Sequence, residues 1–202
     1  MNDGASALRS ARRDDPDRAA GVVSGTRDSL DQVDRVSSAL ITELGRGGCV
    51  FACGNGGSAL AAQHFTAELV GHFRRERPPV RGVALTSDAA LLTVIANDHG
   101  ADQVFSRQVR GLTTANDALL AFSTSGRSPD VLAAGRAARN LGALTVALTG
   151  GEGGELAGMV DLALIVPGTE TARIQEGHLI LIHLIAEQID VAFARDSVLS
   201  EP

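Results

Sequence analysis

The chain has 202 residues, of which 44% are hydrophobic, and this is enough for one domain with a substantial core. Its formal net charge of −6 gives no basic surface for nucleic acid, so we expect no nucleic-acid partner. The sequence has neither a run of 18 apolar residues nor the pattern of a signal peptide, which predicts a cytoplasmic protein without a membrane partner.

The first residues predict a mobile terminus followed by a helix. Residues 1–20 are polar and are expected to be flexible, which leaves a single domain over residues 21–197. From about Thr26 to Gly45, apolar residues recur at the spacing of an amphipathic helix. They occupy more than one helix face, which indicates packing against another subunit as well as the core: Leu30, Val33, Val36, Leu40 and Leu44.

Short apolar runs then alternate with helical stretches. Five such runs are predicted to be strands: Cys49–Ala52, Gly82–Leu85, Ala118–Phe122, Leu144–Leu148 and Leu162–Val166. This alternation predicts an α/β fold with a parallel sheet flanked by helices, in which ligands bind at the carboxyl ends of the strands. The two cysteines lie four residues apart in one strand, hence on one face and too far apart for an easy disulfide.

A glycine-rich turn follows the first predicted strand. Its three glycines, in the segment Gly54–Ser58, permit positive φ angles and a close approach of backbone to ligand, and the next helix points its free N–H groups at the turn. His64 and Glu68 lie four residues apart on one face of that helix, as an acid/base or metal pair requires. A plain strand–turn–helix connection with a surface His–Glu pair explains the turn and the pair equally well.

A hydroxyl-rich loop follows the third predicted strand. Residues 123–129 read Ser-Thr-Ser-Gly-Arg-Ser-Pro and lead into a helix that extends to about Leu141. Ser128 suits the N-cap of this helix, and Pro129 suits its first position. Because a cap needs one hydroxyl and the loop supplies four, anion binding is the better explanation. The glycine-rich segment Thr149–Gly154 lacks such hydroxyls and is read as a turn.

The last helix is predicted from Arg173 to about Phe193 and is apolar almost all round. An isolated histidine on such a helix, here His183, is more often a hydrogen-bonded core residue than a ligand. Gln175 lies roughly 12 Å from it along the axis, so the two converge only if both side chains turn towards each other.

Several motifs in the same order closely resemble the phosphoheptose isomerases, which are sedoheptulose 7-phosphate isomerases of the sugar-isomerase (SIS) superfamily. The resemblance covers about residues 25–195. It implies a flavodoxin-like SIS domain with a five-stranded parallel sheet, an N-terminal helix used in oligomerisation, and a homotetramer with active sites at subunit interfaces. The motifs are Gly54–Ser58 with Ala62–His64 and Glu68, Ala96–Asp98, Phe105–Gln108, Ser123–Gly126 and Arg173–Glu176.

The resemblance also implies roles for individual residues. Glu68 and His183 become the acid/base pair, and one zinc ion per site is bound by His64, Glu68, Gln175 and His183. The reaction is the conversion of sedoheptulose 7-phosphate to D-glycero-D-manno-heptose 7-phosphate by proton transfer through an enediol. The sugar phosphate is bound by Asn55, Gly56, Gly57, Ser58, Glu68, Asn97, Asp98, Ser123, Thr124, Ser125, Ser128 and Gln175.

One position departs from the family. Three residues before His64, where the family usually has Asp, this chain has Ala61, so a carboxylate is missing near the predicted site.

Two other functions remain open from the sequence. One is a non-catalytic SIS-domain regulator that binds a protein partner, a group that lacks the equivalents of Glu68 and His183, which are both present here. The other is isomerisation of a different sugar phosphate.

Overall fold

The computed structural model describes residues 15–194, and within them five parallel strands form one sheet. Their order is β2–β1–β3–β4–β5, so the chain starts inside the sheet and winds outward in both directions, as in flavodoxin-like folds. The predicted fold class is confirmed, and each predicted strand is present with boundaries shifted by at most two residues. The strands are β1 Val50–Gly54, β2 Gly82–Ala84, β3 Ala118–Ser123, β4 Leu144–Gly150 and β5 Leu162–Val166.

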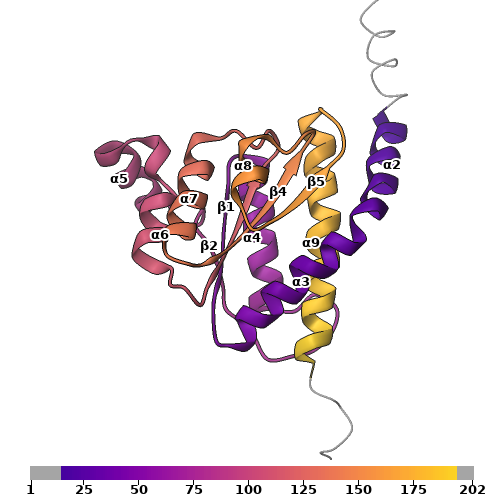
Figure 1. The fold of residues 1–202 in the computed structure, drawn as a ribbon, viewed down its shortest axis with the longest axis horizontal. Coiled ribbons are helices and arrows are strands. Elements are labelled where there is room, and N and C mark those ends of the chain that lie inside the picture. Colours follow the sequence, from indigo (N-terminus) through magenta and orange to yellow (C-terminus); the bar gives the residue numbers. More distant parts are fainter. Residues whose placement is uncertain (1–14, 195–202) are drawn as a thin grey trace, which may run out of the picture.

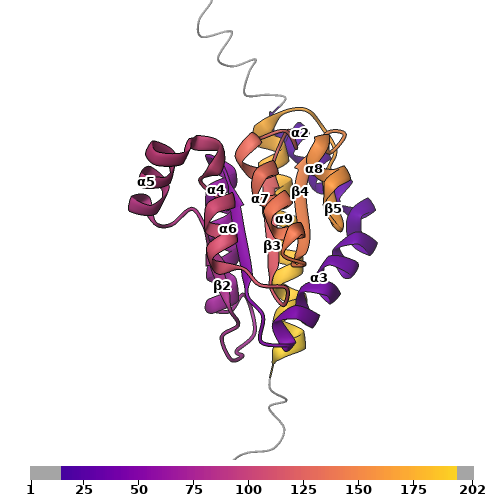
Figure 2. The same cartoon turned by 60° about the vertical axis from the view of Figure 1, so that its left-hand side comes forward.

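Helices cover both faces of this sheet, because its central strands are buried on both sides. Alternate residues of β1 point to opposite faces: Val50 and Ala52 join one core cluster, and Phe51 and Cys53 join the other. The first cluster contains the apolar faces of α3 (Leu30–Gly45), α4 (Gly57–Val70) and α9 (Thr171–Phe193). The second contains those of α6 (Ser106–Leu112), α7 (Pro129–Asn140) and α8 (Gly154–Met159). Figures 1 and 2 show the two helical layers.

The N-terminal helical region is longer than the sequence predicts. Helix α2 (Asp15–Gly25) begins inside the segment expected to be flexible, and a short 3₁₀ turn, η1 (Thr26–Ser29), joins it to α3. The negative charges of Asp15 and Asp17 in its first turn interact favourably with the helix dipole and stabilise the helix. Val22 is buried in the first core cluster. Residues 1–14 and 195–197 of the predicted segments lie outside the described residues.

The alternation of strands and helices predicts helix between β2 and β3 but gives no bounds for it. The connection consists of α5 (Ala89–His99), the 3₁₀ turn η2 (Ala101–Gln103) and α6, of which α5 protrudes. The carboxylate of Asp88 accepts a hydrogen bond from the backbone N–H of Leu91 at 2.9 Å, so an N-cap signal was present. In Figures 1 and 2, α5 lies at one end of the molecule, away from α9, and much of its apolar surface stays outside the core.

The two cysteines behave as predicted. Both are free and buried, and both pack in the second core cluster, on one face of the sheet. Burial raises the pKa of Cys49 to about 11, so its thiol stays protonated near neutral pH. Within residues 15–194, no helix is long and apolar enough to span a membrane.

Candidate active site

The two predicted phosphate-binding loops meet at the carboxyl edge of the sheet. Strands β1 and β3 are neighbours, and Gly54 pairs with Phe122 at their ends, so the chain leaves the sheet at adjacent points. The side-chain amide of Asn55 then donates to both carboxylate oxygens of Asp130, at 3.0 and 2.8 Å. Asp130 follows the hydroxyl loop in the first turn of α7, so this contact ties one loop to the other. Sequence reasoning missed Asp130.

The glycines of the first loop serve different purposes. Gly56 alone of the three has a positive φ, 55°, whereas Gly57 is required by a close approach. A Cβ on Gly57 would lie 2.5 Å from Oε1 of Gln175, because the amide of that side chain, from the fifth residue of α9, rests against the start of α4. Gln175 therefore lies beside the glycine loop, where a substrate contact is expected. Ser58, in the first turn of α4, is buried.

The second loop holds its hydroxyls in an ordered arrangement. Ser123 and Ser128 share a hydrogen bond between their hydroxyls at 3.1 Å, and Oγ of Ser125 accepts from the backbone N–H of Arg127 at 3.2 Å. Pro129 begins α7 as predicted, but Ser128 does not cap the helix with its side chain. Helix α8 supports the loop, since the N–H of Leu156 in its first turn donates to the Gly126 carbonyl at 3.0 Å.

A second group of side chains lies farther along α4, between that helix and α9. The ligand atoms of His64, Glu68 and His183 all lie within 4.8 Å of one another. Nε2 of His64 is 3.0 Å from Nε2 of His183 and 3.3 Å from Oε1 of Glu68. We call these three side chains the catalytic group, after the role that the family resemblance implies for Glu68 and His183. His64 is seven residues beyond the start of α4, or about 10 Å along the helix from the glycine loop.

His183 is not the core histidine that its helix alone suggested. It is partly exposed, and its ring stacks on that of Phe73 with centroids 4.9 Å apart and planes 16° apart. Burial lowers the pKa of His183, the neighbouring His64 ring and the Arg74 guanidinium lower it further, and the Glu68 carboxylate opposes them. The lowered pKa favours a neutral imidazole, which can both donate and accept a proton. Phe73 was missed because nothing in its local sequence points to α9.

The core histidine of α9 is His178 instead. Its Nε2 lies 3.0 Å from the carbonyl of Thr149, and since a carbonyl only accepts, Nε2 carries the proton. Nδ1 has no hydrogen-bond partner in the described part of the chain. Burial lowers the pKa of His178 to about 4, although the bond to Thr149 partly opposes this.

Three further positions complete the comparison with the predicted site. Asn97 and Asp98 lie at the exposed end of α5 and are hydrogen-bonded to each other at 2.7 Å. Since α5 lies far from α9 in both ribbon views, one chain alone does not bring them to the catalytic group. Ala61 is half-buried against the first core cluster, one turn before His64.

The donor atoms of the catalytic group fit a zinc ion. Two nitrogens bound at about 2.0–2.1 Å to one tetrahedral zinc lie about 3.3 Å apart, close to the 3.0 Å between the two imidazoles. Without a metal, the same two nitrogens make one imidazole–imidazole hydrogen bond. The site thus combines one carboxylate and two imidazoles with two polar loops that lie at the carboxyl edge of the parallel sheet. This combination is typical of α/β enzymes that transfer protons on a small polar substrate.

Comparison with known proteins identifies the family. Residues 19–150 match the model of the SIS domain. The chain is 46% identical to phosphoheptose isomerase of Campylobacter jejuni over 162 residues, which are 80% of this chain and 87% of that protein. It is 51% identical to phosphoheptose isomerase of Aromatoleum aromaticum over 75% of this chain and 78% of that protein. The structure of phosphoheptose isomerase from Neisseria gonorrhoeae superposes with a TM-score of 0.81 at 39% identity, over 95% of this chain and all of that one. The chain belongs to the phosphoheptose isomerase family of SIS-domain proteins.

Proposed function

We propose that Glu68 and His183 carry out the proton transfers of an aldose–ketose isomerase that converts sedoheptulose 7-phosphate to D-glycero-D-manno-heptose 7-phosphate. The observation that supports these roles is the convergence of Glu68, His64 and His183 between α4 and α9 in a member of this family. The reaction requires one proton to move from C1 to C2 and another to move between the two oxygens.

The catalytic group offers one side chain for each transfer. The Glu68 carboxylate removes the proton from C1, which gives an enediol, and returns it to C2. The neutral imidazole of His183 donates a proton to O2 and accepts one from O1. His64 lies between the two and contacts both, so it holds their separation. The balance is complete without an added oxidant or reductant.

We assign the phosphate to the loops that begin α4 and α7. Backbone N–H groups at a helix start and nearby hydroxyls suit a phosphate, and the loops lie at the end of the sheet where ligands bind in such folds. One side of this phosphate site is formed by residues at the start of α4 and in α9: Asn55, Gly56, Gly57, Ser58 and Gln175. From the other side come Ser123, Thr124, Ser125 and Ser128. The distance of about 10 Å along α4 from this place to His64 leaves room for a seven-carbon chain between phosphate and reacting carbons.

We also propose that His64, Glu68 and His183 hold one zinc ion. When bound there, zinc supplies a Lewis acid that polarises the sugar carbonyl. Nε2 of His183 cannot ligate a metal and carry a proton at the same time, so zinc binding by all three side chains and proton transfer by His183 compete for one atom. Gln175, whose amide lies beside the glycine loop, is assigned to the substrate.

The activity is tested by incubating the purified protein with sedoheptulose 7-phosphate and following the heptose product by coupled assay. Shorter ketose phosphates serve as the comparison. Turnover of sedoheptulose 7-phosphate with the highest kcat/KM supports the proposal. Higher kcat/KM for a shorter sugar phosphate would assign the chain to another substrate, and absence of turnover on all of them would leave a binding function.

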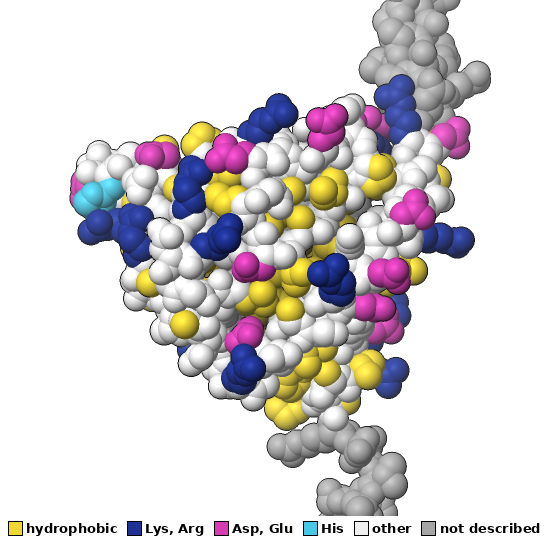
Figure 3. All heavy atoms as spheres, in the orientation of Figure 1, with side chains coloured by type: hydrophobic (Ala, Val, Ile, Leu, Met, Phe, Trp, Pro, Cys, Tyr) yellow, Lys and Arg dark blue, Asp and Glu magenta, His cyan; other side chains and the backbone are white. Residues whose placement is uncertain are grey.

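We further propose that two chains build each active site within a homotetramer. Asn97 and Asp98 lie far from the catalytic group of their own chain, so a second chain must supply them if they contact the substrate. Large apolar side chains remain exposed on the helices that carry the site, among them Leu60, Leu179 and Val191. Figure 3 shows hydrophobic side chains gathered across the middle of one face of the molecule.

Complementation measures this sharing directly. Glu68→Gln and Asn97→Ala homomers are each expected to be inactive, and differently tagged copies of the two are co-expressed and co-purified. If each site takes Glu68 from one chain and Asn97 from another, random mixing restores about a quarter of parental activity, because one pairing in four has both residues intact. Mixed assemblies without recovered activity, or an Asn97→Ala homomer that is fully active, would contradict a shared site.

The position of Ala61 leads to a further prediction. Because Ala61 lies on the same helix face as His64, Ala61→Asp places a carboxylate next to the catalytic group. We expect kcat to rise with little change in KM, since neither phosphate loop involves residue 61. Ala61 packs against the core, so the substitution should also lower stability by about 1 kcal/mol or more. Steady-state kinetics and urea unfolding of parent and variant measure both effects; an unchanged or lower kcat in a folded variant means that this chain does without the carboxylate.

A further inference from the structure

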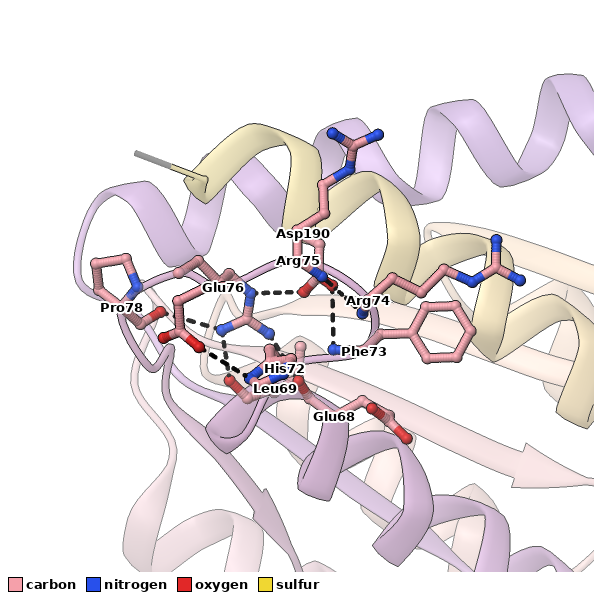
Figure 4. Close-up of polar contacts among 10 residues, drawn as sticks. Glu68, Leu69, His72, Phe73, Arg74, Arg75, Glu76, Pro78 and Asp190 are labelled. Atoms are coloured by element: carbon pink, nitrogen blue, oxygen red, sulfur yellow. Dashed lines mark hydrogen bonds and ion pairs between the residues drawn. The ribbon is translucent and has the colours of Figure 1, made fainter. Parts of the chain in front are cut away.

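The segment between α4 and β2 is fastened to α9 by a buried carboxylate. Oδ2 of Asp190 accepts hydrogen bonds from three consecutive backbone N–H groups, those of Phe73 at 3.0 Å, Arg74 at 2.6 Å and Arg75 at 2.9 Å. Figure 4 shows the chain turning around this side chain, with Phe73 and Arg74 projecting on one side. Burial alone would raise the pKa of Asp190, but these hydrogen bonds and the guanidinium of Arg77 lower it, so the group is a carboxylate.

Arg77 connects that carboxylate to the end of α4. Its Nε donates to Oδ1 of Asp190 at 2.8 Å, its Nη1 to the carbonyl of Leu69 at 2.9 Å, and its Nη2 to the carbonyl of Glu68 at 2.6 Å. The last carbonyls of a helix have no partner within the helix, and a cation there also suits the helix dipole. Both side chains of this pair are fully buried. We call Asp190 and Arg77 the clasp.

The clasp joins the two helices that carry the catalytic group. One of its bonds ends on the backbone carbonyl of Glu68 itself, and Asp190 follows His183 by seven residues, two turns along α9. The segment that it fastens presents Phe73, whose ring lies nearly parallel to the imidazole of His183. The guanidinium of Arg74 in turn lies 5.0 Å from the centre of the Phe73 ring and pairs with Glu187 at 3.2 Å.

We propose that Asp190, Arg77 and Phe73 are positioning residues for the isomerase reaction: the clasp sets the spacing of α4 and α9 at which the catalytic group converges, and Phe73 holds the ring plane of His183. This inference rests on the proposed roles of Glu68 and His183. Stability alone is a weak reason for such a pair, because apolar residues of similar volume often replace a buried ion pair at no cost. Positioning also accounts for the direction of the hydrogen bonds, which end on the backbone of the two segments that carry Glu68 and Phe73.

Phe73 provides the first test, since the change there is small. Phe73→Leu removes the stacked ring, Phe73→Tyr keeps it, and Phe193→Leu, at the last residue of α9, is the matched control. Misplacement of a reacting group by 1 Å can cost about 10²-fold, so we expect Phe73→Leu to lower kcat at least about tenfold with KM almost unchanged. Phe73→Tyr should retain most of the parental kcat, and Phe193→Leu should leave kcat at the parental value.

A second readout is zinc affinity, measured on the same proteins by competition with a chromogenic chelator. Residues that orient metal ligands typically affect affinity by about 10–100-fold, so Phe73→Leu should weaken zinc binding and Phe73→Tyr should not.

The double substitution Arg77→Met with Asp190→Leu removes the clasp without leaving an unpaired buried charge. It should lower kcat and zinc affinity in a protein that still unfolds cooperatively.

The outcomes separate this inference from the proposed function. If Glu68→Gln is inactive while Phe73→Leu and the clasp double variant keep parental kcat and zinc affinity, the positioning role is wrong and the proposed function stands. If Glu68→Gln is fully active, the proposed function itself fails. Loss of kcat in Phe73→Leu that Phe73→Tyr does not restore would also contradict a role for the ring.

Discussion

Glu68→Gln is expected to leave a folded protein that has lost about 10²–10⁴-fold of its kcat on sedoheptulose 7-phosphate, the range that a general acid or base contributes. The amide keeps the size of the side chain and its place next to His64, but it cannot accept the proton from C1. Since the loops that we assign to the phosphate do not include this carboxylate, KM should change much less than kcat. Steady-state kinetics, with circular dichroism to verify folding, measures the effect.

The chain contains a matched control for this substitution. Glu76 pairs with His72 at 3.6 Å in the same i,i+4 relation that joins His64 and Glu68, but outside the catalytic group. Glu76→Gln removes one carboxylate from a His–Glu pair and should leave kcat at the parental value. Activity of Glu68→Gln within about threefold of that control would remove Glu68 from the mechanism.

The second large effect is a loss of stability in acid that originates at His178. The pKa of this histidine is about 4 in the folded protein, against an ordinary value of 6.5 in an unfolded chain. Above pH 6.5 both states are neutral at this position, so stability does not depend on pH there. Between pH 6.5 and 4 the imidazole binds a proton in the unfolded state but not in the folded state. The free energy of unfolding therefore falls as the pH falls. The loss reaches about 3 kcal/mol near pH 4, at 1.36 kcal/mol for each pKa unit.

His178→Gln isolates this contribution. A glutamine can donate to the carbonyl of Thr149 in place of Nε2, but it does not titrate. Urea unfolding at pH 7, 5.5 and 4, at one protein concentration, should show a smaller loss of stability in the variant than in the parent. His72→Gln, which replaces an exposed histidine, should follow the parent. Equal pH dependence of the parent and His178→Gln would mean that His178 is not the group responsible.

Much of this fold could be predicted from the sequence, because local patterns depend on local physics. The apolar runs give five strands, since a strand buried on both faces needs an unbroken apolar sequence. The i,i+4 spacing of His64 and Glu68 ensures that they share a helix face whatever surrounds them. Pro129 and the hydroxyls before it mark the start of α7. The motifs that resemble phosphoheptose isomerases identify the family for the same reason, because each motif is a contiguous stretch.

Contacts between distant segments were decided by the tertiary structure alone. The apolar pattern of the last helix alone predicted His183 to be a core residue and gave no prediction for His178. In the structure, the packing of α9 buries His178 in the core. It turns His183 towards His64, which is 119 residues away in the chain. The stacking of Phe73 on His183 and the clasp between Arg77 and Asp190 depend on the separation and rotation of α4 and α9. Those quantities result from the packing of all the helices on the sheet, and no window of sequence contains them. The sequence by itself thus determined the strands, the two loops and the family, and through the family resemblance it already implied His183 as a site residue. The packing of α4 against α9 decided that His183, and not His178, faces His64.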